Sequence, residues 1–271
     1  MKTTELEEKA IAAFAGTKTP KFLATASAAG VPNIVPIISI EAWDPQTLIF
    51  GEFMIWKTKK NLEENAKVGV SVMTENLNCW TVRGTFLGYE RTGERYDKIS
   101  LNEMYRYNAY SGLRNCGIIR VDDVKRVKGM LAAPRLVEMG FASLASTFAR
   151  KEGAPMPPQV SEKFARAKAA KFISYIDADG YPVALPVPSM FSVGGGALEM
   201  GAGSLKGLDG NMPQSPFRAA ATIITFDPVA YQVKGTVNDF ENRLGTRIAR
   251  LEIDEVYSAS PPLPGKRIDR K

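Results

Sequence analysis

The sequence contains no histidine among its 271 residues. Histidine is the commonest metal ligand in proteins, and its unperturbed pKa lies near neutrality. Its absence excludes Ser-His-Asp and Cys-His triads, Cys₂His₂ zinc sites and haem held by a proximal histidine. Chemistry in this chain therefore needs another source, and a bound organic cofactor is the natural one.

Cysteine and long apolar runs are also scarce. Cys79 and Cys116 are too few for a disulfide framework and have no metal-like spacing, so we predict no metal site and a cytoplasmic, reducing location. No run of about 18 apolar residues occurs, so no membrane association is expected. The net charge of +6 is mild for this length and the basic residues do not alternate with aromatic ones, so no nucleic-acid partner is expected.

The sequence repeats itself at an offset of about 150 residues. Residues 21–36 align with residues 171–186, with the Lys-Phe pair, one glycine and both prolines in common. Residues 82–85 align with 233–236 at an offset of 151, and residues 121–124 align with 253–256 at an offset of 132. The second copy has therefore lost 19 residues, which in the first copy form a helix-like stretch near 94–112.

The repeat predicts two related domains in one chain. Their expected bounds are residues 1–128 for the first domain, 129–160 for a helical and Pro-rich connector with a helix at 135–150, 161–258 for the second domain, and 259–271 for a basic tail. A capping box at Thr4–Glu7 predicts a helix at the start of the first domain, and residues 161–170 predict its counterpart in the second.

Strands dominate both copies. In the first copy we predict them at residues 21–27, 32–41, 47–51, 68–73, 79–90 and 117–127, because these segments alternate or run apolar and are rich in Val, Ile and Thr. The expected fold is mainly β with short helices, antiparallel and Greek-key-like, with each sheet closing towards a barrel. Pro36 and Pro186 cannot donate to a ladder, so we expect them at an edge, at a bulge or where a barrel opens.

A basic helix start is the most informative local feature. Thr58 is predicted to be the N-cap of a short helix that reaches about Ala66, with Lys57, Lys59 and Lys60 beside it. Acidic residues are the usual choice in a first helical turn, because that end carries partial positive charge and unpaired N–H groups. Ammonium groups, a hydroxyl and free N–H groups at one point would suit a phosphate monoester. The alternative is a solvated lysine run on a surface helix.

Several motifs together resemble the pyridoxamine 5′-phosphate oxidase-like family of FMN-binding split β-barrel proteins. They are Phe22–Ala26 followed by Gly30-x-Pro32, Thr47–Phe50, Lys57-Thr58-x-x-Asn61-Leu62 with Asn65-x-x-Val68, and Val82-x-Gly84-Thr85. The resemblance covers nearly all of residues 5–127 and, more weakly, 164–257. It implies two split β-barrel domains in tandem, with FMN in a cleft between barrels that either pair within the chain as a pseudo-dimer or pair between two chains as a homodimer.

The resemblance also implies which residues bind the cofactor. Flanking the isoalloxazine ring would be Val35, Pro36, Ile37, Phe50, Gly51 and Glu52, and holding the phosphate would be Lys57, Thr58 and Asn61. In the second copy, residues 202–213 replace the Lys-Thr motif and its helix, so we predict no equivalent phosphate site there. Trp56, Trp80 and Tyr231 are candidates to stack on the ring, although aromatic residues on strands more often belong to the core.

The function implied is a flavoprotein oxidoreductase that passes electrons or hydride between a reduced nicotinamide, or another donor, and a small acceptor. The alternatives are a carrier or sensor that holds flavin without turnover, and a reductase that uses the deazaflavin coenzyme F420. Pyridoxamine-phosphate oxidation itself is not expected, because the oxidase's C-terminal Arg-x-His is missing here. No catalytic residue is assigned from the sequence.

Overall fold

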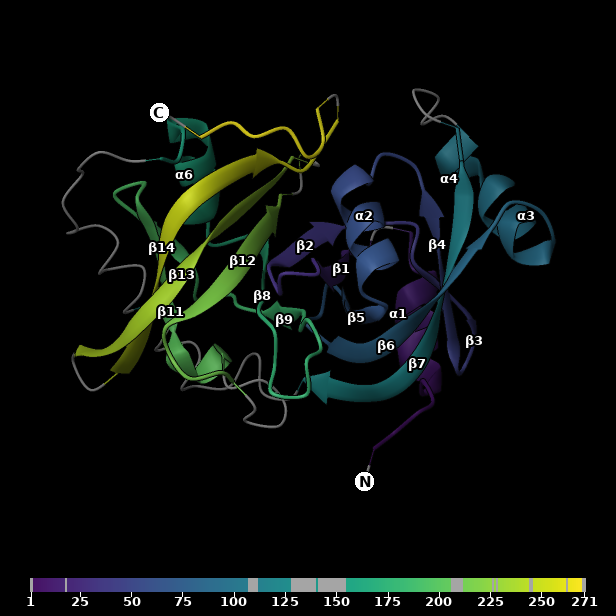
Figure 1. Ribbon diagram of the computed structural model, residues 1–271, viewed down its shortest axis with the longest axis horizontal. Coiled ribbons are helices and arrows are strands. Elements are labelled where there is room, and N and C mark those ends of the chain that lie inside the picture. The colour runs from purple at the N-terminus through teal and green to yellow at the C-terminus, as the bar shows by residue number, and fades with distance from the viewer. Residues whose placement is uncertain are drawn as a thin grey trace.

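The computed structural model describes residues 2–17, 19–106, 112–127, 140, 155–205, 212–225, 227, 229–243, 246–261 and 263–269. These residues form two separate seven-stranded antiparallel sheets, which lie side by side in Figure 1. One sheet lies within residues 21–127 and the other within residues 170–258. The expectation of a mainly β, split-barrel fold is confirmed. Of the helix predicted at 135–150, all but residue 140 falls outside the described residues.

The first sheet carries four helices around it. Its strands are β1 (Lys21–Ala26), β2 (Pro32–Pro36), β3 (Glu41–Asp44), β4 (Thr47–Glu52), β5 (Lys67–Met73), β6 (Cys79–Glu90) and β7 (Asn115–Val127). Their spatial order is β2-β1-β5-β6-β7-β4-β3. The helices are α1 (Glu8–Ala15), α2 (Trp56–Glu64), α3 (Glu94–Ser100) and α4 (Glu103–Arg106).

The second sheet has the same strand order as the first. It begins after α6 (Pro158–Ala165) and contains β8 (Ala170–Ser174), β9 (Leu185–Pro186), β10 (Phe191–Val193), β11 (Ala197–Gly201), β12 (Phe217–Ile224), β13 (Ala230–Arg243) and β14 (Thr246–Ser258), with the 3₁₀ turn η1 (Ala202–Leu205) after β11. Read from its β9 edge, the order is β9-β8-β12-β13-β14-β11-β10. Strands β1 to β7 therefore correspond one by one to β8 to β14.

The two sheets differ at one connection. In the first half, α3 and α4 lie between β6 and β7, whereas in the second half β13 continues to Arg243 and β14 begins at Thr246. This is where the sequence comparison places the 19 residues that the second copy lacks.

Both proline predictions are confirmed by the strand order. Pro36 lies in β2 and Pro186 in β9, and each of these strands is the edge of its sheet. Ile37 N donates to Lys21 O at 2.9 Å, and Ser27 N donates to Val31 O at 3.1 Å. The backbone groups at the odd-numbered positions of β2 therefore bond to β1, and those at the even-numbered positions 32, 34 and 36 point away from it. Two of those three positions are prolines, which cannot recruit a further strand.

Three predicted boundaries are wrong. Helix α1 starts at Glu8, with Glu7 as its N-cap and no side-chain cap, because the Glu7 carboxylate accepts a hydrogen bond from Trp80 Nε1 at 2.6 Å. The strand predicted at 32–41 ends at Pro36, after which a turn leads to β3. Helix α6 begins at Pro158 rather than at residue 161, since proline is well suited to the first helical turn.

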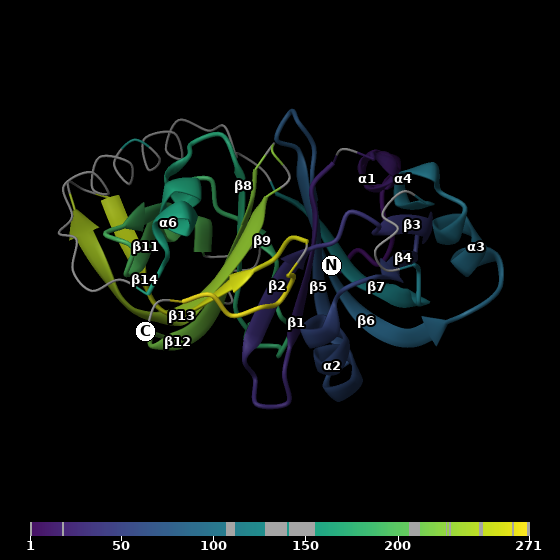
Figure 2. The same cartoon turned by 90° about the horizontal axis from the view of Figure 1, so that it is seen from above.

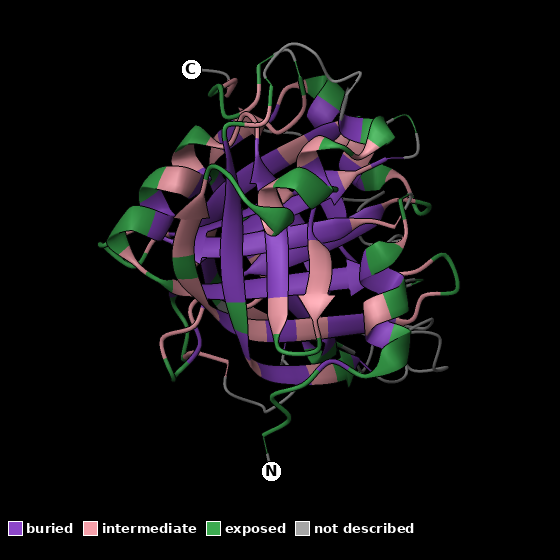
Figure 3. Cartoon of the chain, turned by 90° about the vertical axis from the view of Figure 1, so that its right-hand side faces the viewer, coloured by how far each residue is buried: buried purple, intermediate pink, exposed green. Residues whose placement is uncertain are grey.

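Each sheet encloses its own hydrophobic core, and a further apolar cluster joins them. That cluster includes Phe22, Ala24, Ile34, Phe172 and Ala220, and the rings of Phe22 and Phe172 stack with their centroids 4.0 Å apart. Strand β2 lies beside β12 at this contact (Figure 2), and Figure 3 shows the strands buried beneath more exposed helices. The two halves therefore share an apolar contact centred on equivalent phenylalanines.

Close backbone approach at this contact requires a glycine in β5. A Cβ atom on Gly69 would lie 2.1 Å from the carbonyl oxygen of Pro182 and 3.2 Å from the amide nitrogen of Ala184. Nearby, Ser71 Oγ donates a hydrogen bond to Ala184 O at 2.6 Å. Strand β5 of the first half thus packs directly on the backbone that leads into β9.

Candidate functional site

The start of α2 differs from the prediction by three residues. Its N-cap is Ile55, and the first intrahelical hydrogen bond runs from Lys59 N to Ile55 O at 2.8 Å. Thr58 is therefore inside the first turn and is not the N-cap. The amide N–H groups of residues 56–58 precede that first bond, so this end of the helix carries the partial positive charge that favours an anion.

The lysines of α2 point in different directions and do not converge as predicted. Lys59 pairs with Glu52 of β4, with Nζ 3.0 Å from Oε1. Lys60 is largely exposed and lies 3.7 Å from Glu64 on the same helix. Only Lys57 reaches towards the second half, where it meets Tyr257 of β14. The reason is helical geometry, since successive side chains project about 100° apart around the axis.

The ammonium of Lys57 is buried and has no hydrogen-bond partner among the residues that the structure describes. Its Nζ atom is inaccessible to solvent and lies 3.1 Å from the centroid of the Tyr257 ring, a cation–π contact. The pKa of Lys57 is lowered to about 8, mainly by burial and also by the positive charges of Lys234 and Arg267, against the opposing effect of Glu255. A buried ammonium group whose N–H donors are unused can donate hydrogen bonds to an anion.

Thr58 and Asn61 belong to a buried polar network that crosses between the halves. Asn33 Nδ2 donates to Thr58 Oγ1 at 3.2 Å and to Thr25 Oγ1 at 3.3 Å, and Asn61 Nδ2 donates to Thr25 Oγ1 at 3.0 Å. Gln232 of β13 donates to Asn33 Oδ1 at 3.1 Å. Thr58 is only 1% exposed, and because its oxygen accepts from Asn33 its own hydrogen remains to be donated.

The meeting point of α2 with β13 and β14 will be called the α2 junction; it comprises Lys57, Thr58, Lys234, Glu255 and Tyr257. Glu255 lies opposite Lys234 in the β13–β14 register, and Tyr257 lies opposite Gln232. The Tyr257 hydroxyl donates to Glu255 Oε2 at 2.9 Å. Sequence reasoning missed the three residues from the second half, although Lys234 lies inside the repeated motif at 233–236.

The six residues predicted at the flavin ring differ in how far they are buried. Val35 and Pro36 on the edge strand β2 are half-buried, and Ile37 is buried. The Phe50 side chain is fully buried and packs against Phe86 and Tyr89 in the core. Phe50 can therefore offer a ligand its backbone but not its ring.

Gly51 and Glu52 end the same strand, and both are held by hydrogen bonds to other residues of the first half. Ser39 Oγ accepts a hydrogen bond from Gly51 N at 3.0 Å. Glu52 is 2% exposed, and besides its ion pair with Lys59 it accepts a hydrogen bond from Asn115 Nδ2. The Glu52 carboxylate is thus neutralised within the first half.

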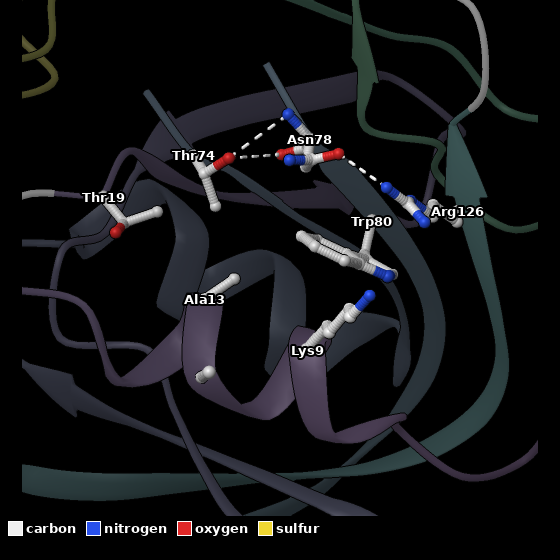
Figure 4. A pocket seen from close by; sticks show the side chains of 8 residues that line it. Lys9, Ala13, Thr19, Thr74, Asn78, Trp80 and Arg126 are labelled. Atoms are coloured by element: carbon white, nitrogen blue, oxygen red, sulfur yellow. Dashed lines mark hydrogen bonds between the residues drawn. The ribbon is translucent and has the colours of Figure 1, made fainter. Parts of the chain in front are cut away.

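Two of the aromatic candidates have other partners. Trp80 belongs to the core of the first half, and its ring also lines a pocket of about 420 Å³ with Lys9, Ala13, Asn78 and Arg126 (Figure 4). In this pocket Arg126 Nη2 donates to Asn78 Oδ1 at 2.6 Å, so its cation is already bonded. Trp56 is 56% exposed and lies under the Arg114 guanidinium, 4.1 Å from its ring centroid.

Among the described residues, no group of three or more histidine, cysteine, aspartate or glutamate side chains could hold a metal ion. No helix in this part of the chain is both long enough and apolar enough to span a membrane.

Comparison with known proteins gives structural likenesses to about half of the chain. No family model and no curated protein matches the sequence. An FMN-binding protein from Syntrophomonas wolfei is 25% identical over 45% of this chain and 85% of its own, with a TM-score of 0.41. A putative pyridoxamine 5′-phosphate oxidase from Lactobacillus delbrueckii is 19% identical over 46% of this chain and 99% of its own, with a TM-score of 0.38.

A third solved structure, HupZ from Group A Streptococcus, is 22% identical over 45% of this chain and 94% of its own, with a TM-score of 0.39. The solved structures that this chain resembles thus include proteins of the expected split-barrel family.

Proposed function

We propose that this protein binds a flavin, FMN in the first place, through its phosphate at the α2 junction. The observation that carries the proposal is Lys57, whose ammonium is buried at a helix start without a hydrogen-bond partner. A phosphate monoester would receive hydrogen bonds from this ammonium, from the Thr58 hydroxyl and from the free N–H groups of the first turn. Asn61 takes a supporting part, because it helps to fix Thr25 and the network that orients Thr58.

The ring would extend from the phosphate towards β2 and the end of β4. Val35 and Pro36 are half-buried on an edge strand, and although Val35 also packs against the core of the first half, the exposed part of this edge can contact a flat ligand. Phe50, Gly51 and Glu52 would contribute main-chain groups. Because Lys59 neutralises Glu52, we expect this carboxylate to place little net charge near the ring.

The reaction we propose is transfer of hydride or electrons from a reduced nicotinamide to a small acceptor. Bound FMN would supply the redox chemistry, and the chain would bind it, orient it and set the charge around it. Anaerobic addition of NADH or NADPH to the FMN-loaded protein tests this reaction. Bleaching followed by reoxidation with turnover supports an oxidoreductase, whereas flavin that stays oxidised supports a carrier.

We also infer that residues 1–128 and 161–258 are two copies of one domain, which pair within the chain as a pseudo-dimer. The identical strand order and the stacked pair Phe22 and Phe172 support this inference. In such a pair the second copy supplies the wall that faces α2.

Titration with FMN tests the binding proposal, with riboflavin as the ligand that lacks a phosphate. Replacing Lys57 with Met keeps the apolar stem and removes the charge, so we expect FMN affinity to fall by about tenfold or more while riboflavin affinity hardly changes. Lys60→Met on the exposed face of the same helix is the matched control and should bind FMN as the parent does. A parent protein that takes up no FMN would refute the proposal.

A further inference from the structure

The two halves face each other through two junctions that correspond by strand order. The α2 junction contains Lys234 of β13, and Lys234 occupies the repeat position of Arg83 of β6. Arg83 lies at what will be called the β6 junction, which comprises Arg83, Asp177 and Asp179. Each junction thus brings one basic strand residue to the other half of the chain.

At the β6 junction this cation is neutralised by acidic residues of the same chain. Arg83 Nη2 lies 2.6 Å from Asp177 Oδ2, and Arg83 Nη1 lies 3.2 Å from Asp179 Oδ2. Asp177 is buried, and its other oxygen accepts hydrogen bonds from the amide nitrogens of Asp179 and Tyr181 at 3.0 Å and 2.9 Å. A carboxylate fixed by the turn between β8 and β9 therefore fills the position where Arg83 would meet an external anion.

At the α2 junction no such carboxylate is supplied from the corresponding turn. The repeat positions of Asp177 and Asp179 in the first half are Ser27 and Ala29, and neither is acidic. Lys234 is only 5% exposed, and no hydrogen bond or ion pair joins it to any residue that the structure describes. Glu255 faces it across the β13–β14 pair, but this single carboxylate also accepts from Tyr257 and lies 3.8 Å from Arg267.

The charge balance at the α2 junction is therefore positive. Among the described residues neither Lys57 nor Lys234 has a hydrogen-bonded partner, while Arg267 lies 3.8 Å from Glu255 and is itself paired with Asp269. Burial lowers the pKa of both lysines below the ordinary value. The Lys57 ammonium, which is inaccessible to solvent, is costly unless an anion joins it, and the positive charge of Lys234 adds to that cost.

We propose that Lys234 acts together with Lys57 on one phosphate dianion, so that each chain has a single anion site to which both halves contribute, while Asp177 closes the equivalent β6 junction. The ligand class is a phosphate monoester, and the inference rests on the proposed function in taking FMN as that monoester. Arg267 is exposed and is already paired with Asp269, so it is not part of this site.

The test compares Lys234→Met with Arg83→Met and with Lys60→Met as the exposed control. We expect Lys234→Met to weaken FMN binding by about tenfold to a hundredfold and to leave riboflavin binding unchanged within about twofold. Lys234→Arg should restore most of the FMN affinity. Arg83→Met should bind FMN as the parent does, because its partner is Asp177.

A thermal melt without ligand separates this role from a structural one. Removing an unpaired buried charge relieves its desolvation cost, so ligand-free Lys234→Met should melt at the same temperature as the parent or higher. Unchanged FMN affinity in Lys234→Met, with weakened affinity in Lys57→Met, would overturn this inference and leave the proposed function standing. Failure of the parent to bind FMN would overturn both.

Discussion

The two junctions have the same strand arrangement, but their basic residues have different partners. At the β6 junction Arg83 is paired with Asp177 and Asp179, and the contact is a closed ion pair between the halves. At the α2 junction Lys57 and Lys234 outnumber the single Glu255, and the helix start adds partial positive charge. The first junction therefore holds the two halves together through an ion pair, whereas the second one carries positive charge that its single carboxylate does not balance.

Breaking the closed junction should have the largest effect on stability. Asp177→Ala removes the buried one of the two carboxylates that pair with Arg83, and it deprives two amide N–H groups of their acceptor. We expect the free energy of unfolding to fall by about 3 kcal/mol, measured by urea denaturation. Ser27→Ala at the equivalent position removes a single acceptor, for Val31 N at 3.2 Å, and should cost about 1 kcal/mol or less. Equal losses in the two variants would contradict the contrast between the junctions.

The contact between the halves can be disturbed without touching any charge. Gly69→Ala places a Cβ atom against the Pro182 carbonyl, so we expect a loss of about 1–3 kcal/mol in the free energy of unfolding. Gly196→Ala is the control, because no atom lies within 4 Å of its added Cβ. If both variants unfold at the same denaturant concentration as the parent, then β5 does not pack on this backbone as closely as described.

Ligand affinity at the α2 junction should depend on pH. The pKa of Lys57 is lowered to about 8, so this lysine is protonated below that value and loses its charge above it. FMN carries a phosphate dianion above about pH 6. Affinity for FMN should therefore be highest between about pH 6 and 8 and should fall as the pH rises further, by about tenfold at most, whereas riboflavin affinity stays level. A flat FMN profile across this range would exclude Lys57 as the titrating group.

A further pH dependence, of stability and not of ligand affinity, concerns two lysines at equivalent repeat positions. Lys21 Nζ donates to Ile38 O at 3.0 Å, and Lys171 Nζ donates to Met190 O at 2.6 Å. Burial lowers the pKa of Lys21 to about 8 and that of Lys171 to about 7, below the ordinary 10.5. The unfolded chain therefore holds more protons than the folded one from these values up to about 10.5, and stability contributed by these groups rises with pH in that window.

Lys171→Met should flatten this pH dependence more than Lys21→Met does, because the window for Lys171 opens at a lower pH. Unfolding free energies measured at about pH 7 and about pH 9 provide the comparison. A larger change for Lys21→Met would reverse the expected order of burial.

Local patterns in the sequence predict most of the fold. Apolar alternation places β1, β4, β5, β6 and β7 to within two residues, and the missing N–H of Pro36 and Pro186 correctly indicates edge strands. The helix starts are predicted less well, because distant residues compete for the capping groups. Glu7 bonds to Trp80, and the Thr58 hydroxyl bonds to Asn33, so neither is free to cap as the local sequence indicates.

The candidate site is only half visible in the sequence. Lys57, Thr58 and Asn61 were found through a motif, whereas Lys234 and Tyr257 come from strands of the second half that only tertiary packing brings to α2. The divergence of Lys57 and Lys59 was predictable from the helical angle of about 200° that separates them. The role of Lys234 could not be predicted, since it depends on which repeat position carries an acidic turn partner.

We propose that the α2 junction holds one phosphate-bearing ligand per chain and that the β6 junction holds none. The most direct test is the stoichiometry of FMN bound to the purified, folded chain at saturation, measured by absorbance after removal of free ligand. We expect one FMN per chain, lost on Lys57→Met and retained on Arg83→Met. Two FMN per chain, or one that disappears with Arg83 and survives without Lys57, would contradict it.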